Sequence, residues 1–598
     1  SDDARKPNLK GVPAGNKKSG AAAGAPSAKD SNAAAHTSNA DTEAKQPAFT
    51  SLNQITSAVV EAAHSLETVE SKVADAGQLR VKQLRLVSRS VTRCCNALST
   101  FIPHPATSTA FHPSGADVLE LWSQMAALLD RMCHTVSKFY EHMSATDTYH
   151  DQKEGNVREW QRGISRLQQT LTDYAAQGAS PVVQAALTTA ANLERSVVRF
   201  GVDWERRHRK AGGSSVASAE SKEPSETDAA AAARGKFLGL LERAARGVEA
   251  WSSSGWIPRL TVFGSAAAGL TSANSDVDVE LSLYTASGQL VPPEQVLPSR
   301  PQGAAASNTA GASAMAQDAA ETRRHMMMSI LRALAESLHK HNISFTSYFR
   351  ARVPLLKIAD PSSALRCDLV YHDDTAHRAE KTALLTAFVR LDARVAPFIR
   401  AIKQWAMVRD MGDASKGGMN SFSWSLLAIH ALQRVQPPIL PPVSEAGALT
   451  ASSAASHPDA MDVDVPMFSA FQPAANAMTH SELLRFFFSL YTDKFQPGHQ
   501  AISVRASQFI PLNESFANDA KAHGTALFVE DPFDEHDNTA RTVSAGVFRT
   551  IRHELLRGLL LTSPAGAGGK DAGGAAVDPV AQLMWPVPKD AVIQAMFF

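Results

Sequence analysis

Two aspartates, Asp276 and Asp278, stand one residue apart in the apolar segment 276–284, DVDVELSLY. Side chains alternate across a strand, so both carboxylates would point to one face while Val277 points into a core. Neighbouring carboxylates repel each other unless a cation lies between them. Mg²⁺ is the usual ion because it binds carboxylate and phosphate oxygens together. Asp368, in the apolar segment LRCDLVYH, would complete a two-metal site of the kind that activates a hydroxyl and neutralises leaving pyrophosphate.

A Gly-Ser pair lies shortly before these aspartates. Gly264 allows the backbone to approach a ligand closely, and the hydroxyl of Ser265 can bind a phosphate oxygen. Taken alone, Asp-x-Asp is commonly a solvated turn and Gly-Ser is commonly a loop. The combination is more specific, because it needs a strand, Gly-Ser, Asp-x-Asp on the following strand, and then a lone Asp between apolar residues. The pattern therefore predicts phosphoryl transfer that works mainly by positioning and charge.

The elements that must position these residues form a β-rich region between helices. The segments RLTVFGS and DVDVELSLY are typical of two strands of one hairpin-like unit, and the helical pattern KFLGLLERAARGVEAW precedes them. A second helical pattern, RRHMMMSILRALAESLHKH, is followed by two more predicted strands in ARVPLLKIAD and LRCDLVYH. From about residue 379 we expect helices to the end of the chain.

The chain has 598 residues, which predicts several domains in series. The expected parts are a disordered tail (1–48), a helical bundle that serves as a docking module (49–210), a linker (211–232), a catalytic domain (233–380) with a disordered insertion at about 286–320, a helical domain for recognition of the nucleotide base (381–562) with a disordered insertion at about 437–477, and a spacer with an apolar tail (563–598).

Charge and composition restrict the partners. The formal net charge is zero, so a polyanion would be bound by a local basic surface and not by bulk charge. The four cysteines show no CxxC and no Cys/His metal spacing, which indicates a reducing compartment without a zinc module. No apolar run approaches the roughly 20 residues that a membrane span needs, so no membrane association is expected.

The stretch from Gly264-Ser265 to Asp276-Val277-Asp278 resembles the signature of nucleotidyltransferases of the DNA polymerase β superfamily. More narrowly, the chain resembles the terminal uridylyltransferases and the cytoplasmic-type poly(A) polymerases, and its insertions and Ala-rich bias resemble the trypanosomatid members. Five further segments are similar to family segments and occur in the same order, so the resemblance covers about residues 233 to 560: ARVPLLKIAD, LDARVAPFIRAIKQWAMVRD, GGMNSFSWSLLAIHALQ, SELLRFFFSLYTDKFQPGHQAISVR and VEDPFDEHDNTARTV. It implies an α+β fold, with a polymerase-β-like palm, a helical poly(A)-polymerase-associated domain and an N-terminal helical bundle before them.

The resemblance also implies roles for single residues. Asp276, Asp278 and Asp368 match the catalytic, metal-binding triad, with Asp368 nearest the RNA 3′ hydroxyl. Mg²⁺ is the implied cofactor, with Mn²⁺ as an alternative. Gly264 and Ser265 would hold the nucleotide triphosphate.

Further matches lie on the predicted helices. Lys403 matches the first phosphate-binding lysine, and Ser421 matches a residue that contacts the triphosphate. Phe422 stands in place of the tyrosine that stacks on the incoming base, a contact worth roughly 1–3 kcal/mol per base. Thr382 matches a Ser or Thr that contacts the sugar, whereas Lys381 replaces the usual Asn beside it.

Met407 occupies the place of a second family lysine, so one positive contact is missing or replaced, with Lys416 and Arg409 as candidate substitutes.

The choice of nucleotide is predicted from EDPFDEHDNTARTV. In the uridylyltransferases, acidic residues at the positions of Asp531 and Asp534 sense the uracil edge. An ionised carboxylate only accepts hydrogen bonds, which suits the N3–H of uracil better than N1 of adenine. Asp537 replaces a histidine that favours UTP in some members. The sequence of the segment is also similar to that of the poly(A)-adding relatives. We therefore expect UTP as the substrate, with ATP as the alternative.

The resemblance further implies a single-stranded RNA 3′ end as partner. Such ends are bound by base stacking and by a basic path along the backbone, for which Arg350 and Arg352 are the candidates. The clusters Arg323–Arg324 and 206–210 could extend that path. The N-terminal helices would dock on a protein or ribonucleoprotein complex. The chain begins with Ser1, which is compatible with a cleaved presequence, and the trypanosomatid likeness favours a mitochondrial location over a cytoplasmic or nuclear one.

Two alternatives to uridylation follow. One is an adenylating enzyme of the same fold. The other is an interaction protein that uses the fold as a scaffold in an RNA–protein assembly, which the departures at Met407 and Lys381 motivate. The intact carboxylate triad argues against a scaffold, because repelling carboxylates without a metal would have no purpose.

Overall fold

The fold is seen in a computed structural model of the chain. It describes residues 52–74, 228–271, 276–296, 312–360, 365–445, 475–563 and 578–587, together with single positions between 120 and 206 and at 468 and 471. The expected disordered tail lies outside the described residues. In the N-terminal helical region, helix α1 (Leu52–Ala74) is described, and helical positions follow between 188 and 206. None of the helices described is long and apolar enough to cross a bilayer.

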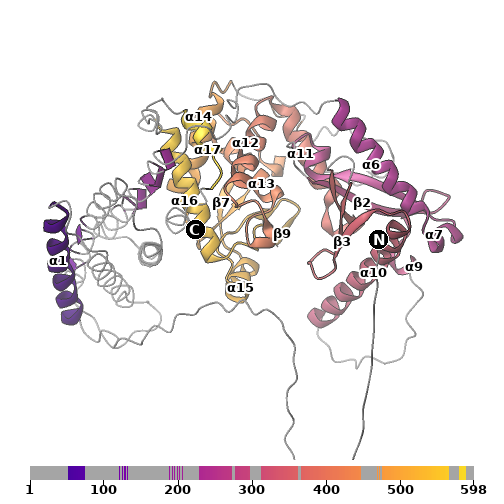
Figure 1. Ribbon diagram of the computed structural model, residues 1–598, viewed down its shortest axis with the longest axis horizontal. Helices are drawn as coiled ribbons and strands as arrows, with labels where there is room; N and C mark the ends of the chain where they lie inside the picture. Colours follow the sequence, from indigo (N-terminus) through magenta and orange to yellow (C-terminus); the bar gives the residue numbers. More distant parts are fainter. Residues whose placement is uncertain are drawn as a thin grey trace, which may run out of the picture. The chain divides into compact units, whose positions relative to one another are not determined.

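A five-stranded mixed sheet is the centre of the palm, with strand order β1-β2-β5-β4-β3 (Figure 1). Strand β2 pairs antiparallel with β1 and parallel with β5, and β4 lies antiparallel between β5 and β3. The predicted hairpin-like unit is confirmed as β1–β2, whereas strand β3 was not predicted. The strands are β1 (Ile257–Phe263), β2 (Val277–Tyr284), β3 (Ser344–Tyr348), β4 (Leu355–Ala359) and β5 (Arg366–Tyr371).

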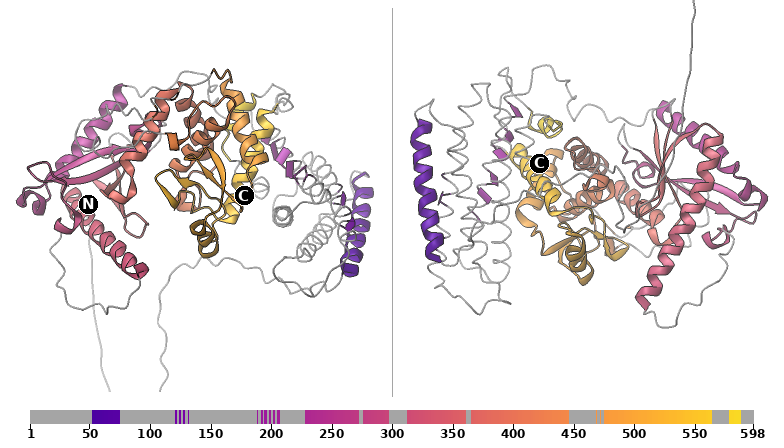
Figure 2. Two further views of the ribbon diagram at one scale, coloured as in Figure 1. Left: turned by 180° about the vertical axis from the view of Figure 1, so that it is seen from behind. Right: turned by 60° about the horizontal axis from the view of Figure 1, so that its bottom comes forward.

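Helices α6 (Asp228–Arg246) and α10 (Ala312–Lys340) pack on one face of this sheet (Figures 1 and 2). Their apolar side chains share a core with Val277, Val279 and Leu369, all at most 3% exposed. The opposite face is therefore left for the acidic residues of β2 and β5. Shorter helices follow α6 and flank β2: α7 (Glu249–Ser253), α8 (Gly264–Ala267) and α9 (Pro293–Val296).

The C-terminal part is built from helices around an aromatic core. Trp405, Trp424 and Phe487 are at most 1% exposed, and the rings of Trp405 and Trp424 meet edge to face at 5.5 Å. Such edge-to-face pairs are worth about 0.5–1.5 kcal/mol beyond the burial of their area. The helices are α11 (Arg378–Leu391), α12 (Val395–Val408), α13 (Ser421–Arg434), α14 (His480–Ser489), the π-helical turn η4 (Leu490–Lys494), α16 (Ala545–Thr562) and α17 (Pro579–Leu583).

The expectation of helices alone after residue 379 is wrong, because two small antiparallel sheets interrupt them. Strand β6 (Gln500–Ser503) pairs with β7 (Gln508–Pro511), and β8 (Glu530–Asp531) pairs with β9 (Asp534–Asn538). Helix α15 (Glu514–His523) lies between the two hairpins in sequence. Three 3-10 turns complete the described elements: η1 (Asp374–Ala376), η2 (Ala414–Lys416) and η3 (Val443–Glu445).

The expected disordered insertions are too wide. Helices α9 and α10 occupy the two ends of 286–320, so residues 297–311 are the part that lies outside the described residues. Similarly, η3 lies inside 437–477, and the ring of Phe468 stacks on Phe388 at 4.8 Å. The last five residues of the expected linker belong to α6. Part of the apolar tail docks on the body, because Gln582 and Leu583 of α17 are at most 1% exposed.

Candidate active site

The carboxylates of β2 and β5 meet across a parallel strand pair. Asp278 lies directly opposite Asp368 in the register of the two strands. Asp276 comes directly before the first residue of β2. Val277 and Val279 are at most 3% exposed, so the aspartates face away from the core as expected. The structure thus brings the predicted triad together on the free face of the sheet.

Two basic side chains, neither anticipated from the sequence, bind these carboxylates. The ammonium of Lys357 on β4 lies 3.0 Å from Oδ2 of Asp368 and 3.5 Å from Oδ2 of Asp276. Nε of Arg366 lies 2.7 Å from Oδ1 of Asp276. In the register of β4 and β5, Lys357 is opposite Asp368, which places both side chains on the same face. The two cations offset the mutual repulsion of the three acids.

The residues fit a divalent cation. Within the described part of the chain no three His, Cys, Asp or Glu side chains are already gathered in a metal-binding group. Lys357 and Arg366 each bind an oxygen of these carboxylates instead. However, Oδ1 of Asp368 is buried and has no hydrogen-bond partner. A buried carboxylate oxygen without a partner next to two further acids is the donor set that Mg²⁺ prefers.

Asp278 lies deepest in the triad. Burial, and after it the charge of Asp368, raise the pKa of Asp278 to about 7. Gly264 comes directly after β1 with φ of +66°, and a Cβ built there would lie 3.1 Å from Oδ2 of Asp278. Glycine is required at this position for two reasons, the left-handed backbone and the close approach of the acid.

A cluster of hydroxyls and one ammonium lies beside the triad. Nζ of Lys403 on α12 donates to Oγ of Ser265 at 2.9 Å and to the carbonyl oxygen of Leu270 at 2.8 Å. Oγ of Ser421, the first residue of α13, lies 3.4 Å from Oγ of Ser265. Burial lowers the pKa of Lys403 to about 8, while the charge of Asp278 opposes the shift. An ammonium and two hydroxyls next to three acids are suited to a metal-bound triphosphate.

Thr382 on α11 acts on the Gly-Ser turn. Its Oγ1 accepts the amide hydrogen of Gly264 at 2.9 Å and donates to the carbonyl oxygen of Arg378 at 2.7 Å. The hydroxyl is therefore satisfied inside the protein, and its observed contact is with the turn that approaches Asp278. The amide of Gly264 is likewise used inside the protein, so the glycine contributes its conformation.

The proposed replacement of the second lysine by Arg409 is wrong. Arg409 is fully buried and binds Glu205 and Glu554 at 3.0 and 2.6 Å. Lys416 has 80% of its side chain exposed and pairs with Asp413 at 3.2 Å. Met407 itself is 49% exposed.

Arg400 is a better substitute, although the sequence analysis did not consider it. It lies one helical turn before Lys403 and donates to the carbonyl oxygen of Gly269 at 2.9 Å. Its charge also contributes to the lowered pKa of Lys403, so the two cations lie close together. The signal in the sequence was its spacing of three residues from Lys403.

The residues expected to recognise the base lie around the start of α13. Phe422 is half-buried, and the ammonium of Lys381 lies 5.6 Å from the centroid of its ring. The same ammonium lies 2.5 Å from Oδ2 of Asp531, whose side chain is 2% exposed. Oδ1 of Asp531 accepts the amide hydrogen of Phe533 at 3.0 Å. Both carboxylate oxygens of Asp531 thus have a partner inside the protein, and the expectation that Asp531 senses the uracil edge stays a prediction.

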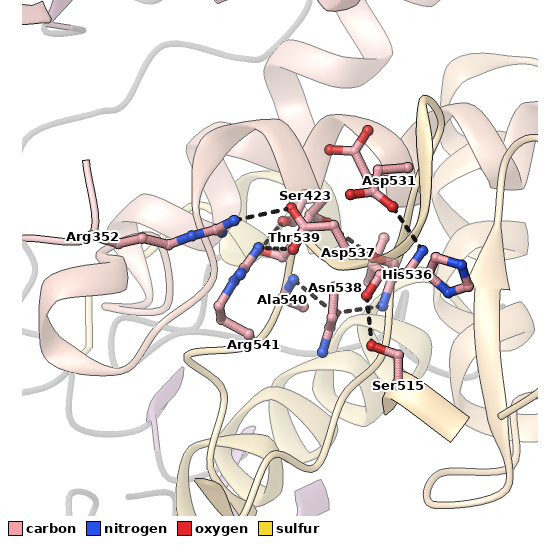
Figure 3. A network of polar contacts seen from close by, with 12 residues as sticks. Arg352, Ser423, Ser515, Asp531, His536, Asp537, Asn538, Thr539, Ala540 and Arg541 are labelled. Atoms are coloured by element: carbon pink, nitrogen blue, oxygen red, sulfur yellow. Dashed lines mark hydrogen bonds and ion pairs between the residues drawn. The ribbon is translucent and has the colours of Figure 1, made fainter. Parts of the chain in front are cut away.

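The rest of the β8–β9 segment is held by polar contacts (Figure 3). Oδ1 of Asp534 accepts the amide hydrogen of His536 at 3.0 Å, and the residue is exposed. The side chains of Arg352 and Arg541 both point to Asp537 (Figure 3), with Arg352 at 3.6 Å. Asp537, at the position where some uridylyltransferases are expected to have a histidine, is thus a carboxylate whose charge is balanced by two arginines.

The candidate RNA-binding arginines differ in their availability. Arg350 and Arg352 are exposed in the turn between β3 and β4, and Arg352 also contacts Asp537. Arg324 does not extend the path, since it donates to the carbonyl oxygens of Phe349, Ala351 and Arg352 at 2.6–2.7 Å.

The other expected basic cluster, 206–210, begins with a buried residue. Arg206 is 7% exposed, and its Nε donates to Oε1 of Gln582 at 2.7 Å.

A mixed sheet that carries a carboxylate triad beside a hydroxyl-and-lysine cluster is the arrangement that the resemblance to polymerase-β-like nucleotidyltransferases predicts. Residues 217–390 match the family model "Poly(A) RNA polymerase, mitochondrial-like, central palm domain", and residues 481–537 match "Cid1 family poly A polymerase". Over these ranges the chain is similar to poly(A) polymerases and terminal uridylyltransferases. The expected α+β fold class, a palm plus a poly(A)-polymerase-associated domain, is confirmed.

The curated relatives include both poly(A) RNA polymerases and a terminal uridylyltransferase. The chain is 30% identical over 221 residues to the poly(A) RNA polymerase GLD2 of Mus musculus, a match that covers 34% of this chain and 42% of that protein. It is 27% identical over 231 residues to the terminal uridylyltransferase cid1 of Schizosaccharomyces pombe, covering 35% of this chain and 54% of that protein. The chain thus spans about half or less of the length of these relatives. A solved structure of Cid1 poly(U) polymerase is 20% identical, with a TM-score of 0.42, over 60% of this chain and 93% of that chain.

Proposed function

We propose that this protein is an RNA 3′-terminal nucleotidyltransferase. It transfers a nucleoside monophosphate from a nucleoside triphosphate to the 3′ hydroxyl of RNA and releases pyrophosphate. The 3′ oxygen forms a bond to the α-phosphorus while the bond from the α-phosphorus to the bridging oxygen breaks. The pairing of Asp278 with Asp368 next to the Ser265–Lys403 contact carries the proposal, because it sets acidic ligands and phosphate ligands side by side.

Each group of residues has a task in this reaction. Lys403, Ser265 and Ser421 bind the triphosphate and orient it toward the acids. The ring of Phe422 offers a face on which the base stacks. Asp368, whose unpartnered Oδ1 would help to hold the cation, is the acid expected nearest the 3′ hydroxyl. A bound divalent cation, when present, supplies charge neutralisation at the phosphates and activation of the hydroxyl.

The relatives and the sequence pattern are compatible with either UTP or ATP as the nucleotide substrate. UTP was expected from the carboxylates of Asp531 and Asp534, whereas the ion pair of Lys381 with Asp531 is an observation that favours the adenylating alternative. The partners in this proposal are a single-stranded RNA 3′ end and, through residues 49–210, a protein or ribonucleoprotein complex. A mitochondrial location is part of the proposal and is tested by fractionation of cells that express the tagged chain.

The decisive experiment is extension of a short labelled RNA by the full chain with Mg²⁺ and each nucleoside triphosphate separately, beside Asp278→Ala. We expect a ladder of longer products with UTP or ATP that Asp278→Ala abolishes. The Asp360→Ala variant, a change of the same kind outside the triad, should keep the ladder. Absence of extension with every nucleotide on several RNAs would contradict the proposal and favour a scaffold.

A further inference from the structure

The choice of base depends on which hydrogen-bonding groups lie beside the ring of Phe422. Lys381 places its ammonium 5.6 Å from the centroid of that ring, a distance at which a cation is attracted to the aromatic face. About a quarter of the lysine side chain, 23%, is exposed. A nucleotide whose base stacks on Phe422 therefore meets a positively charged donor.

The acid next to this lysine has little capacity left for a base. Asp531 is 2% exposed, and its two carboxylate oxygens are used separately, one by Lys381 and one by the amide of Phe533. Phe533 in turn packs its ring on His377, which precedes α11, at 6.0 Å. The β8–β9 turn is thus fixed to the start of α11 by two contacts, so Asp531 is held in its pairing with the lysine.

The neighbouring acids also have partners inside the protein. Asp534 accepts the amide hydrogen of His536 from its exposed position. Asp537 is bound by Arg541 and approached by Arg352 (Figure 3). Each of these carboxylates therefore has at least one partner inside the protein, and Asp531 is the one that is both buried and bound at its two oxygens.

The remaining chemistry distinguishes the two bases. An ammonium has three N–H donors and no acceptor, and one of the three is used by Asp531. Adenine offers a ring-nitrogen acceptor, N1, on the edge where uracil offers the N3–H donor. A donor facing a donor leaves a polar group unpaired, which costs more than a hydrogen bond gains.

We infer that the ion pair of Lys381 and Asp531 determines the base selectivity of this site and favours adenine over uracil. The inference rests on the proposed function for the identity of the site, and it names ATP as the preferred nucleotide. Lys381 acts in two ways. It donates to the base, and it withdraws the carboxylate that would otherwise accept from uracil.

Three variants separate these two actions. Lys381→Asn removes the donor and frees the carboxylate, so the ratio of ATP to UTP binding should fall by about tenfold or more. Asp531→Asn keeps the ammonium, so the preference for ATP should remain. The double variant removes both charges, and its ratio should be close to one. It also avoids an unpaired buried charge, so it keeps the inference testable if Lys381→Asn alone does not fold.

The measurement is the dissociation constant of non-transferable ATP and UTP analogues with Mg²⁺, by titration calorimetry on the full chain. It is repeated as kcat/KM for RNA extension. Lys521→Asn, the same substitution at an exposed position of α15, is the matched control and should keep the wild-type ratio.

The binding assay separates failure of the inference from failure of the proposed function. If the chain binds ATP analogues better than UTP analogues and Lys381→Asn reverses this, the inference stands even where RNA extension is absent. A preference for UTP in the wild type, or a ratio unchanged in both Lys381→Asn and the double variant, would overturn it. Absence of binding of either analogue would overturn both conclusions.

Discussion

The ammonium of Lys357 bridges Asp276 and Asp368, at 3.5 and 3.0 Å from their Oδ2 atoms. The lysine thus binds two of the acids that would hold a divalent cation, so the two positive charges compete for these acids. Replacing Lys357 with Met should tighten Mg²⁺ binding by roughly threefold to tenfold, a modest effect because the lysine is 42% exposed. The increase in melting temperature across a Mg²⁺ titration measures this.

Lys340→Met, at the exposed end of α10, is the matched control for that titration and should behave as wild type. Weaker Mg²⁺ binding in Lys357→Met would mean that the lysine assists the cation instead of competing with it.

Gly264→Ala should reduce nucleotide transfer strongly, because the new methyl group would lie 3.1 Å from Oδ2 of Asp278. The left-handed backbone at φ +66° adds a destabilisation of about 1–2 kcal/mol. Gly255→Ala is the matched control, because Gly255 has the same left-handed backbone, with φ of +70°, but no heavy atom within 4 Å of an added Cβ. If Gly264→Ala and Gly255→Ala lose the same stability but Gly264→Ala loses more kcat, the additional loss comes from the contact with Asp278. If the two variants have the same kcat, the proposed role of Gly264 is refuted.

Thr382→Val should raise the KM for the nucleotide, because it removes the acceptor that holds the amide of Gly264. The partly buried amide would be left unpaired, at a cost of about 1–3 kcal/mol in the free energy of unfolding. Thr386→Val, one turn along α11, deletes a hydroxyl that bonds to the carbonyl oxygen of Thr382 and does not contact the turn. If both variants change KM equally, the effect comes from the helix and not from the turn.

Arg409→Met should destabilise the chain by about 3–5 kcal/mol, since it leaves Glu205 and Glu554 buried with only Arg557 of their two arginine partners. Chemical denaturation followed by tryptophan fluorescence measures the loss. Arg485→Met on the exposed face of α14 is the control and should change stability by no more than about 0.5 kcal/mol. A neutral Arg409→Met would mean that the buried acids find other partners.

Stability should fall on mild acidification because of His430. This histidine is fully buried, its Nδ1 lies 3.0 Å from the hydroxyl of Tyr491, and burial lowers its pKa to about 3. A folded-state pKa below the unfolded value of about 6.5 means that the unfolded chain takes up the proton first. His430 should therefore contribute a loss of about 2 kcal/mol between pH 7 and pH 5.

His430→Phe should reduce that dependence, measured as the change in denaturation midpoint between the two pH values. The exposed His523→Gln should leave it unchanged. A wild-type slope retained in His430→Phe would show that other groups are responsible.

The catalytic acids could be predicted from sequence because the signals are local. The alternation around Asp278 and the apolar neighbours of Asp368 define strand faces without any knowledge of pairing. Lys357 could not be assigned in this way. It lies between Leu356 and Ile358, so the alternation places it outward, but its contact with Asp368 depends on the register of β4 against β5.

Other errors come from long-range contacts and short elements. The end of α12 suggested an accessible Arg409, yet its partner Glu205 lies 204 residues away in sequence. Strands β8 and β9 have two and five residues, and the second, DEHDN, carries no apolar alternation.

The buried arginines also bear on how this protein can be divided. Glu205 accepts from Arg409 and Arg557, and the carbonyl oxygens of Gln582 and Trp585 accept from the same two guanidinium groups. Glu205 lies before both ranges that match the family models, and Gln582 lies after them. A fragment cut at the outer limits, 217 and 537, would keep Arg409 but would lack its partners Glu205, Glu554 and Trp585. The unit that must be expressed for crystallisation or engineering is therefore wider than the unit that sequence comparison outlines.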